Sequence, residues 1–113
     1  MARTQQLIFE NVRSVAFGAI TNAFLPLGSV FGGPVSTLFF YNGTDALIQI
    51  SFDGTNAHWQ SSASTYDQAI GTAAGYDSSK AFFPENIQMY VRYTGAAPTL
   101  GIFWVNVLRL QNV

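Results

Sequence analysis

Hydrophobic and polar residues alternate along several stretches of the chain, and a period of two residues is typical of β-strands rather than helices. The clearest stretch is residues 35–41, a run rich in β-branched and aromatic side chains. Residues 46–52 alternate in a similar way, which predicts Ile48, Ile50 and Phe52 in the core and the polar residues between them on the outside. Both stretches are therefore predicted strands.

The sequence Asn42-Gly43-Thr44 separates these two stretches. Asn-Gly supplies the positive φ angles that a tight hairpin turn requires, so we expect residues 35–41 and 46–52 to pair as a hairpin. Asp-Gly at residues 53–54 predicts a second turn, which ends the second strand.

The β pattern continues toward both ends of the chain. Residues 1–11 alternate weakly, which predicts either a first strand or an N-terminal arm docked on a neighbouring subunit. The other predicted strands are residues 12–25, a brief one within 56–60, 80–83 (stopped by Pro84), 87–93 and 100–110.

Turns at regular intervals and the lack of a convincing helical pattern predict an all-β fold. We expect a single antiparallel β-sandwich of about six to eight strands, either jelly-roll-like or immunoglobulin-like. The 113 residues are enough for one domain, residues 1–113, with one core.

The loop at residues 25–34 is unusual because it is apolar. Its Gly and Pro density predicts irregular structure, yet it contains Leu27, Val30 and Phe31. Loops normally run over the surface of a protein. Either these three residues fold back over the core, or they form a contact surface for another subunit, and we take them as candidate interface residues.

Residues 61–79 are rich in Ser, Ala, Gly and Thr and show little periodicity, which predicts a long connection. Connections longer than about 12–15 residues are usually functional or contact-forming. Tyr66 and Tyr76 in this segment, and Trp59 before it, could cap the end of the sandwich, anchor an interface or stack on a sugar. Tyr66 and Tyr76 are therefore further candidate interface residues.

Charge is sparse. No charged residue occurs between Ser14 and Thr44, and charged residues make up 10% of the chain against 49% hydrophobic residues. A small free-standing domain usually has a surface with roughly 25–35% charged residues. We therefore expect a partner to cover part of this surface.

The uncharged stretch is not a predicted membrane span, because Gly and Pro interrupt it before about 18–20 apolar residues accumulate. Glu10 lies where a secretory signal would carry positive charge, so export through a cleaved signal is not expected.

The five Lys and Arg residues are spread along a chain of net charge −1, so we expect no nucleic-acid partner. The chain has no cysteine, which leaves no disulfide and no thiolate metal site and suits synthesis in a reducing cytoplasm.

Candidate catalytic groups are few. His58 is the only histidine, and no Gly-x-Ser-x-Gly elbow accompanies it. The six carboxylates show no spacing that pairs them for glycoside hydrolysis. Residues 53–56 resemble the start of a calcium loop without its later acidic ligands, and Asn42-Gly43-Thr44 matches a glycosylation acceptor but is better interpreted as a turn. We expect no catalytic residue, no metal and no cofactor, and therefore no enzyme.

Parts of the sequence resemble small virion proteins of tailed bacteriophages. Residues 41–54, Tyr-Asn-Gly-Thr-Asp-Ala-Leu-Ile-Gln-Ile-Ser-Phe-Asp-Gly, are similar to a pattern in which an Asn-x-Thr-Asp turn leads into a strand ending in Ser-Phe-Asp-Gly. Residues 86–91, Asn-Ile-Gln-Met-Tyr-Val, and 101–105, Gly-Ile-Phe-Trp-Val, are similar to the later strands of such proteins. The resemblance covers roughly residues 35–110 and departs from the pattern at 61–79, where the loop is longer.

The resemblance implies a small β-sandwich that builds a phage particle, without catalytic residues to carry over. Together with the sparse charge, it leads us to expect a capsid decoration or cement protein, located in the virion after synthesis in the host cytoplasm. Its partners would be the major capsid protein or tail proteins, and further copies in a homo-oligomer such as a trimer. The alternative in this class is a tail, baseplate or head–tail connector component. An alternative from another class is a carbohydrate-binding module, which a flat row of Trp or Tyr would distinguish.

Overall fold

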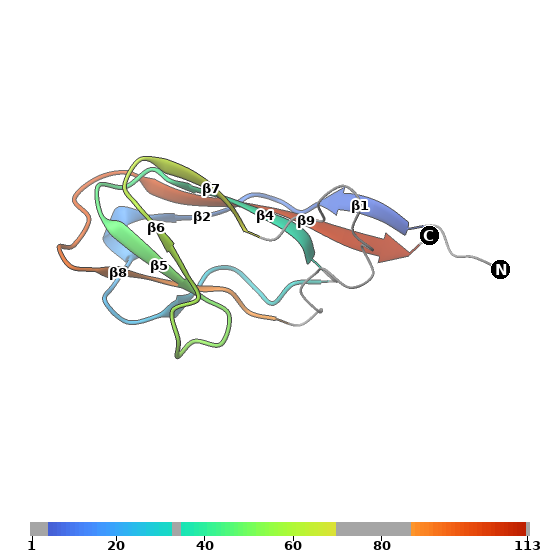
Figure 1. The fold of residues 1–113 in the computed structure, drawn as a ribbon, viewed down its shortest axis with the longest axis horizontal. Helices are drawn as coiled ribbons and strands as arrows, with labels where there is room; N and C mark the ends of the chain where they lie inside the picture. The colour runs from blue at the N-terminus through green and yellow to red at the C-terminus, as the bar shows by residue number, and fades with distance from the viewer. Residues whose placement is uncertain (1–4, 33–34, 70–86, 113) are drawn as a thin grey trace.

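A computed structural model describes residues 5–32, 35–69 and 87–112 (Figure 1). These residues form nine strands and one short 3-10 turn, η1 (Phe17–Ala19), and the strands make two antiparallel sheets. The predicted β-sandwich is therefore confirmed. The strands are β1 (Gln5–Phe9), β2 (Arg13–Ala16), β3 (Leu25–Pro26), β4 (Val35–Asn42), β5 (Leu47–Ser51), β6 (Trp59–Ser61), β7 (Thr65–Ala69), β8 (Tyr90–Thr94) and β9 (Ile102–Asn112).

The five-stranded sheet is built around β9, the longest strand. β2 pairs with the first part of β9 and β1 with its last part, so the two short strands share one edge of it. β4 pairs with the other edge, and β7 lies beyond β4. The strand predicted within residues 1–11 is confirmed, and it docks on β9 of its own chain.

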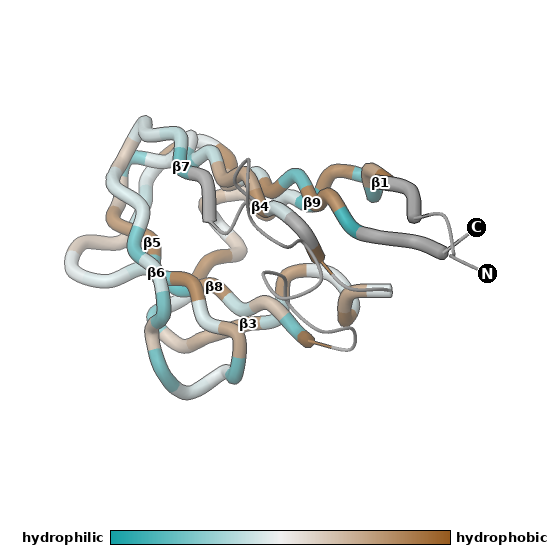
Figure 2. Tube along the Cα trace, turned by 45° about the vertical axis from the view of Figure 1, so that its right-hand side comes forward, coloured by the Kyte–Doolittle hydropathy of each residue, from teal (hydrophilic) through white to brown (hydrophobic). Residues whose placement is uncertain are grey.

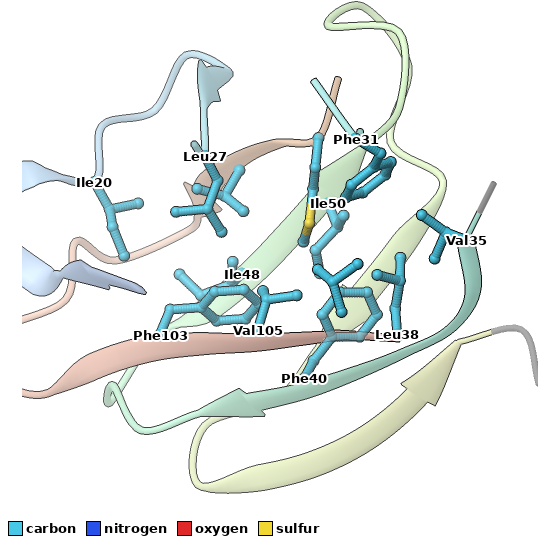
Figure 3. Close-up of a cluster of buried hydrophobic side chains, with 13 residues drawn as sticks. Ile20, Leu27, Phe31, Val35, Leu38, Phe40, Ile48, Ile50, Phe103 and Val105 are labelled. Atoms are coloured by element: carbon cyan, nitrogen blue, oxygen red, sulfur yellow. The ribbon is translucent and has the colours of Figure 1, made fainter. Parts of the chain in front are cut away.

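The four-stranded sheet has the order β3-β8-β5-β6, and the core lies between the two sheets (Figure 3). β4 contributes Leu38 and Phe40, which are buried. The ring of Phe40 stacks on that of Phe103 from β9, with ring centroids 6.1 Å apart. Burial of each such side chain stabilises the fold by about 1.5–3 kcal/mol. The other fully buried side chains of the core include Phe31, Val35, Ile48, Ile50, Met89, Val91, Val105 and Val107.

The predicted hairpin between residues 35–41 and 46–52 is wrong, because β4 and β5 belong to different sheets. The chain crosses between the sheets after Asn42, whose buried side chain holds the crossing. Its Nδ2 donates to the carbonyl oxygens of Ala46 (2.8 Å) and Ser61 (2.9 Å), while its Oδ1 accepts from the N–H (3.0 Å) and hydroxyl (2.6 Å) of Thr44. Gly43 does not have a positive φ. Asn-Gly at this place therefore marks a crossing between sheets rather than a hairpin.

The second turn is confirmed, with Gly54 at φ +80°. Ser51, predicted on the outside of its strand, is instead buried. Its hydroxyl donates to Asp53 Oδ1 at 2.9 Å and accepts from the N–H of Gly54 at 2.9 Å. The side chain therefore points inward because it bonds to the residues of the turn.

The apolar loop at residues 25–34 packs against the core as far as it is described. Leu27 and Phe31 are buried, and their N–H groups donate to carbonyl oxygens of the segment before β8. This corrects the expectation that both side chains form an outer contact surface, because neither is exposed on the folded chain. Val30, by contrast, is exposed.

Arg13 of β2 fixes the apolar loop in place through its backbone carbonyl groups. Its guanidinium donates to the carbonyl oxygens of Leu27 (3.0 Å) and Ser29 (2.6 Å), and lies 4.7 Å from the ring centroid of Phe31. The bond to Leu27 is partly buried and the bond to Ser29 is exposed, so the bond to Leu27 contributes more to holding the loop. A charged residue just outside the uncharged stretch therefore supplies the polar contacts that the stretch lacks.

Two further segments differ from their predictions. Residues 12–25 form strands only at their ends, because β9 begins at Ile102, opposite Ala16, and offers no partner beyond it. Within the predicted connection at 61–79, residues 65–69 form β7 on the edge of β4. The rest of that connection and the strand predicted at 80–83 lie outside the described residues.

The molecule is elongated, with extents of 53 × 24 × 24 Å. β1 and the last part of β9 extend past the sandwich as a two-stranded ribbon, in Figure 1 and again in the turned view of Figure 2. We call this part, residues 5–9 with 108–112, the terminal ribbon.

Candidate functional site: an aromatic face

The outer side of the five-stranded sheet carries apolar side chains that no described element covers. Along β4 and β9, buried and outward residues alternate: Phe40 and Phe103 point into the core, while their neighbours point away from it. Tyr66 is 79% exposed and Trp104 is 39% exposed. We call this surface the aromatic face; its members are Phe39, Tyr41, Tyr66, Ile102 and Trp104.

Strand register places three of these rings in one row. Tyr41 lies opposite Tyr66 of β7 on one side and opposite Trp104 of β9 on the other. The rings of Tyr41 and Tyr66 stack, with centroids 4.4 Å apart and planes inclined by 26°. Such a pair adds about 0.5–1.5 kcal/mol beyond its area. The row is therefore partly ordered before any partner binds.

The surroundings of the row are uncharged. Ser14 of β2 lies opposite Trp104, Ala16 lies opposite Ile102, and Asn106 lies opposite Phe39. All three neighbours are exposed and none carries a charge. A partner that covered this face would therefore desolvate apolar and weakly polar groups but no charged group. Burial of a charged group is the costly step in forming an interface.

The predicted interface residues are not brought together. Tyr66 lies on the aromatic face, Val30 is exposed on the apolar loop, Leu27 and Phe31 are in the core, and Tyr76 lies outside the described residues. The other aromatic members of the face were missed at the sequence level. Their signal was available, because residues 38–41 and 102–105 are apolar at successive positions, and a strand that is apolar on both sides has a second surface to cover.

Ser51, Asp53 and His58 lie close together, but not in the order that hydrolysis requires. A Ser-His-Asp site places the histidine between the other two residues. Here Asp53 is in the middle, 2.9 Å from the hydroxyl of Ser51 and 3.8 Å from Nε2 of His58. Nδ1 of His58 accepts from the N–H of Phe52 at 3.0 Å, and Ser51 is buried. The cluster has the geometry of a capped turn.

Asp53 holds that turn as an anion. Its carboxylate accepts from the N–H groups of Asn56 and Thr55, both at 2.8 Å, and these bonds, together with that from the side-chain amide of Asn56, hold the pKa of Asp53 well below its ordinary value of 3.8. Because the folded-state pKa is the lower one, this carboxylate stabilises the fold above its unfolded pKa. The contribution is lost as the pH falls from there through the folded-state pKa.

A titration checks this assignment. We expect the side-chain carboxyl carbon of Asp53 in the folded protein, followed by NMR, to titrate at lower pH than in a peptide of residues 50–57. The peptide is the matched control, since it contains the same donors without the fold. Equal midpoints in protein and peptide would contradict the hydrogen bonds to the carboxylate.

An open groove of about 750 Å³ lies between the segment that joins β1 to β2 and the apolar loop. Glu10 crosses it, pairing with Arg13 at 2.9 Å and with Nε of Arg109 at 3.1 Å. Arg13 also donates to the loop, so its donors are engaged within the chain. We assign these ions a structural role, because the Glu10 carboxylate contacts both guanidinium groups and links β9 to the segment before β2.

Within residues 5–32, 35–69 and 87–112, no helix is long and apolar enough to cross a bilayer. The same residues contain no group of three or more His, Cys, Asp or Glu side chains that could hold a metal ion. Compared with protein-family models, with curated proteins and with solved structures, the chain matches none of them.

Proposed function

We propose that this chain is a structural subunit of a virus particle, a decoration or cement protein of a phage capsid that binds neighbouring virion proteins through its aromatic face. The observation that carries the proposal is the uncharged row of Tyr66, Tyr41 and Trp104 across three adjacent strands. Tyr and Trp are enriched at the centres of protein interfaces, where burial of apolar area contributes about 25 cal/mol per Å².

The sparse charge of the chain and its resemblance to small virion proteins support the particle as the setting. Virion sites are symmetric, so such a subunit is present in many copies and meets further copies of itself, as in a trimer. The same face would also serve a tail, baseplate or connector subunit. Copy number separates the two locations, with hundreds of copies for a cement and about six to twelve for a ring.

The direct test is quantitative mass spectrometry of particles purified from cultures that carry the gene. We expect peptides of this chain at hundreds of copies per particle. A count near a single ring would move the protein to the tail or connector. Particles that lack the chain would overturn the virion assignment.

A variant tests the role of the face itself. Tyr66→Thr with Trp104→Thr removes two rings from the row and keeps β-branched side chains in both strands. If each ring is an interface anchor worth about 2 kcal/mol, binding to particles that lack the chain should weaken by roughly 1,000-fold, as measured by co-sedimentation.

Phe17→Ser is the matched control, because Phe17 is 39% exposed, like Trp104, but lies in η1 and is not one of the three rings of the row. This control is expected to bind like the unmodified chain. Equal binding by the double variant and the unmodified chain would exclude the aromatic face from the contact.

A carbohydrate-binding module is the second candidate, because a row of exposed rings also suits the faces of sugars. The stacking of Tyr41 on Tyr66 opposes it, since each ring turns one face toward the other instead of toward a ligand. A glycan array with the Trp104→Thr variant as control decides between them. Glycan binding that depends on Trp104 would favour the module, and its absence would favour the protein interface.

A further inference from the structure

The terminal ribbon has two open edges in the described structure. The pairing of β4 with β9 begins at Val35 and Arg109, so residues 110–112 of β9 have β1 on one side and no described strand on the other. β1 pairs with β9 alone among the described strands. A two-stranded ribbon is marginally stable in water, so this part of the fold gains most from a further strand.

The edge of β1 lacks the usual protection against pairing. Natural edge strands are blocked by charged side chains, Pro or bulges. Residues 5–9, Gln-Gln-Leu-Ile-Phe, contain neither charge nor Pro, and Phe9 is 72% exposed. Residues 10–12, which join β1 to β2, follow directly, and there Glu10 pairs with Arg13 and Arg109. The open edge therefore has a defined end at Phe9.

The hydrogen-bond pattern shows which backbone groups are free. The N–H of Glu10 donates to the carbonyl of Val107 at 3.0 Å. In an antiparallel pair, the residues that bond to the partner alternate with residues whose N–H and C=O point to the other side. Counting back from Glu10, the backbone groups of Gln5, Leu7 and Phe9 point to the free edge.

We propose that a second copy of this chain pairs antiparallel with the free edge of β1, about a twofold axis at Leu7, so that one sheet runs through both copies. Antiparallel pairing of a strand with its own copy gives an isologous, closed contact. With the axis at Leu7, this residue lies opposite itself, and each Gln5 lies opposite the Phe9 of the other copy. All three residues with free backbone groups are then used, and within the described residues 5–9 this is the one antiparallel register that pairs all three.

Charge supports a second copy as the occupant. In this pairing Leu7 meets its own copy and Gln5 meets Phe9, so a charge at residue 7, or like charges at residues 5 and 9, would oppose it. Residues 5–9 carry none, and the net charge of −1 adds little repulsion between whole chains. The inference goes beyond the proposed function, because it concerns the isolated chain and an edge away from the aromatic face.

The test is the mass of the purified full chain by sedimentation velocity over a range of concentrations. We expect a dimer. Gln5→Lys with Phe9→Lys places positive charges opposite one another twice in the proposed register, and should raise the dissociation constant roughly tenfold or more. Gln5→Lys with Phe9→Glu places opposite charges together instead and should restore the dimer. Within one chain these two positions are four residues apart in an extended strand, so the two variants differ little as monomers.

Leu7→Pro is an independent variant, since it removes a free-edge N–H without removing a bond to β9, and should give a folded monomer by circular dichroism. Leu7→Ala keeps the N–H and should remain a dimer. A wild-type monomer at all concentrations, or an oligomer that the charge variants leave unchanged, would overturn the inference. The Tyr66→Thr, Trp104→Thr variant should still dimerise, which separates this result from failure of the proposed function.

Discussion

Replacing Asn42 with alanine is expected to lower the free energy of unfolding by about 3–5 kcal/mol. Its buried amide group makes four hydrogen bonds, to Ala46, Ser61 and both the N–H and hydroxyl of Thr44. Alanine would leave two buried carbonyl oxygens and one N–H without this partner, and each such group costs about 1–3 kcal/mol. Urea unfolding at neutral pH, followed by fluorescence of Trp59 and Trp104, measures the change.

Two controls isolate the hydrogen bonds. Asn106→Ala removes the same group from an exposed position on β9, and should change stability by less than about 0.5 kcal/mol. Asn42→Asp keeps one acceptor but sets a carboxylate against two carbonyl oxygens, so its folded-state pKa should rise and its stability should fall from pH 4 to pH 7. If Asn42→Ala is as mild as Asn106→Ala, the crossing does not depend on this amide.

Gly101→Ala is expected to destabilise the protein by about 3 kcal/mol or more, or to prevent folding. Gly101 has φ +93°, which side chains rarely adopt, and a Cβ at this position would overlap the carbonyl of Gly43. The approach is tight from the other side as well, since a Cβ on Gly43 would lie 2.6 Å from the carbonyl oxygen of Ile102. Thermal unfolding by circular dichroism gives the size of the effect.

Gly95→Ala is the matched control. Gly95 has φ +77°, but a Cβ there would have no atom within 4 Å. This variant therefore pays the backbone strain alone, about 1–2 kcal/mol. The difference between the two variants measures the close approach of the backbones, and equal effects would mean that no such approach exists in solution.

The individual strands could be predicted because alternation is a local property. In β9, Phe103, Val105 and Val107 are buried and alternate with exposed or half-buried neighbours, as the pattern of residues 100–110 indicates. Which strands pair is not a local property, and the predicted pairing across Asn42-Gly43 was wrong. The two strands that flank this sequence are neighbours along the chain, but both edges of β4 are occupied, by β9 and β7. The residues of the turn contain no information about which strands occupy those edges.

Of the members of the aromatic face, the sequence predicted Tyr66 alone, for a related reason. Whether an apolar residue lies in the core or on an outer face depends on which side of a sheet faces the other sheet. Leu27 and Phe31 belong to a segment whose Gly and Pro content predicts a surface loop, yet both pack in the core, and the carbonyl of Leu27 accepts from Arg13, 14 positions earlier. Trp104 alternates with core residues, and alternation alone does not say which of the two sets is inside.

The place of β9 in the five-stranded sheet has a consequence for synthesis. β1, β2 and β4 all pair with this strand, which follows them along the chain. On the ribosome, β1, β2 and β4 must therefore wait for residues 102–112 to emerge before they can pair with β9. Nascent chains hold apolar, unpaired strands in water during this interval, which is the state most prone to aggregation. The rate of translation and the access of chaperones to the nascent chain should therefore govern the yield of folded protein more strongly than the stability of the finished sandwich.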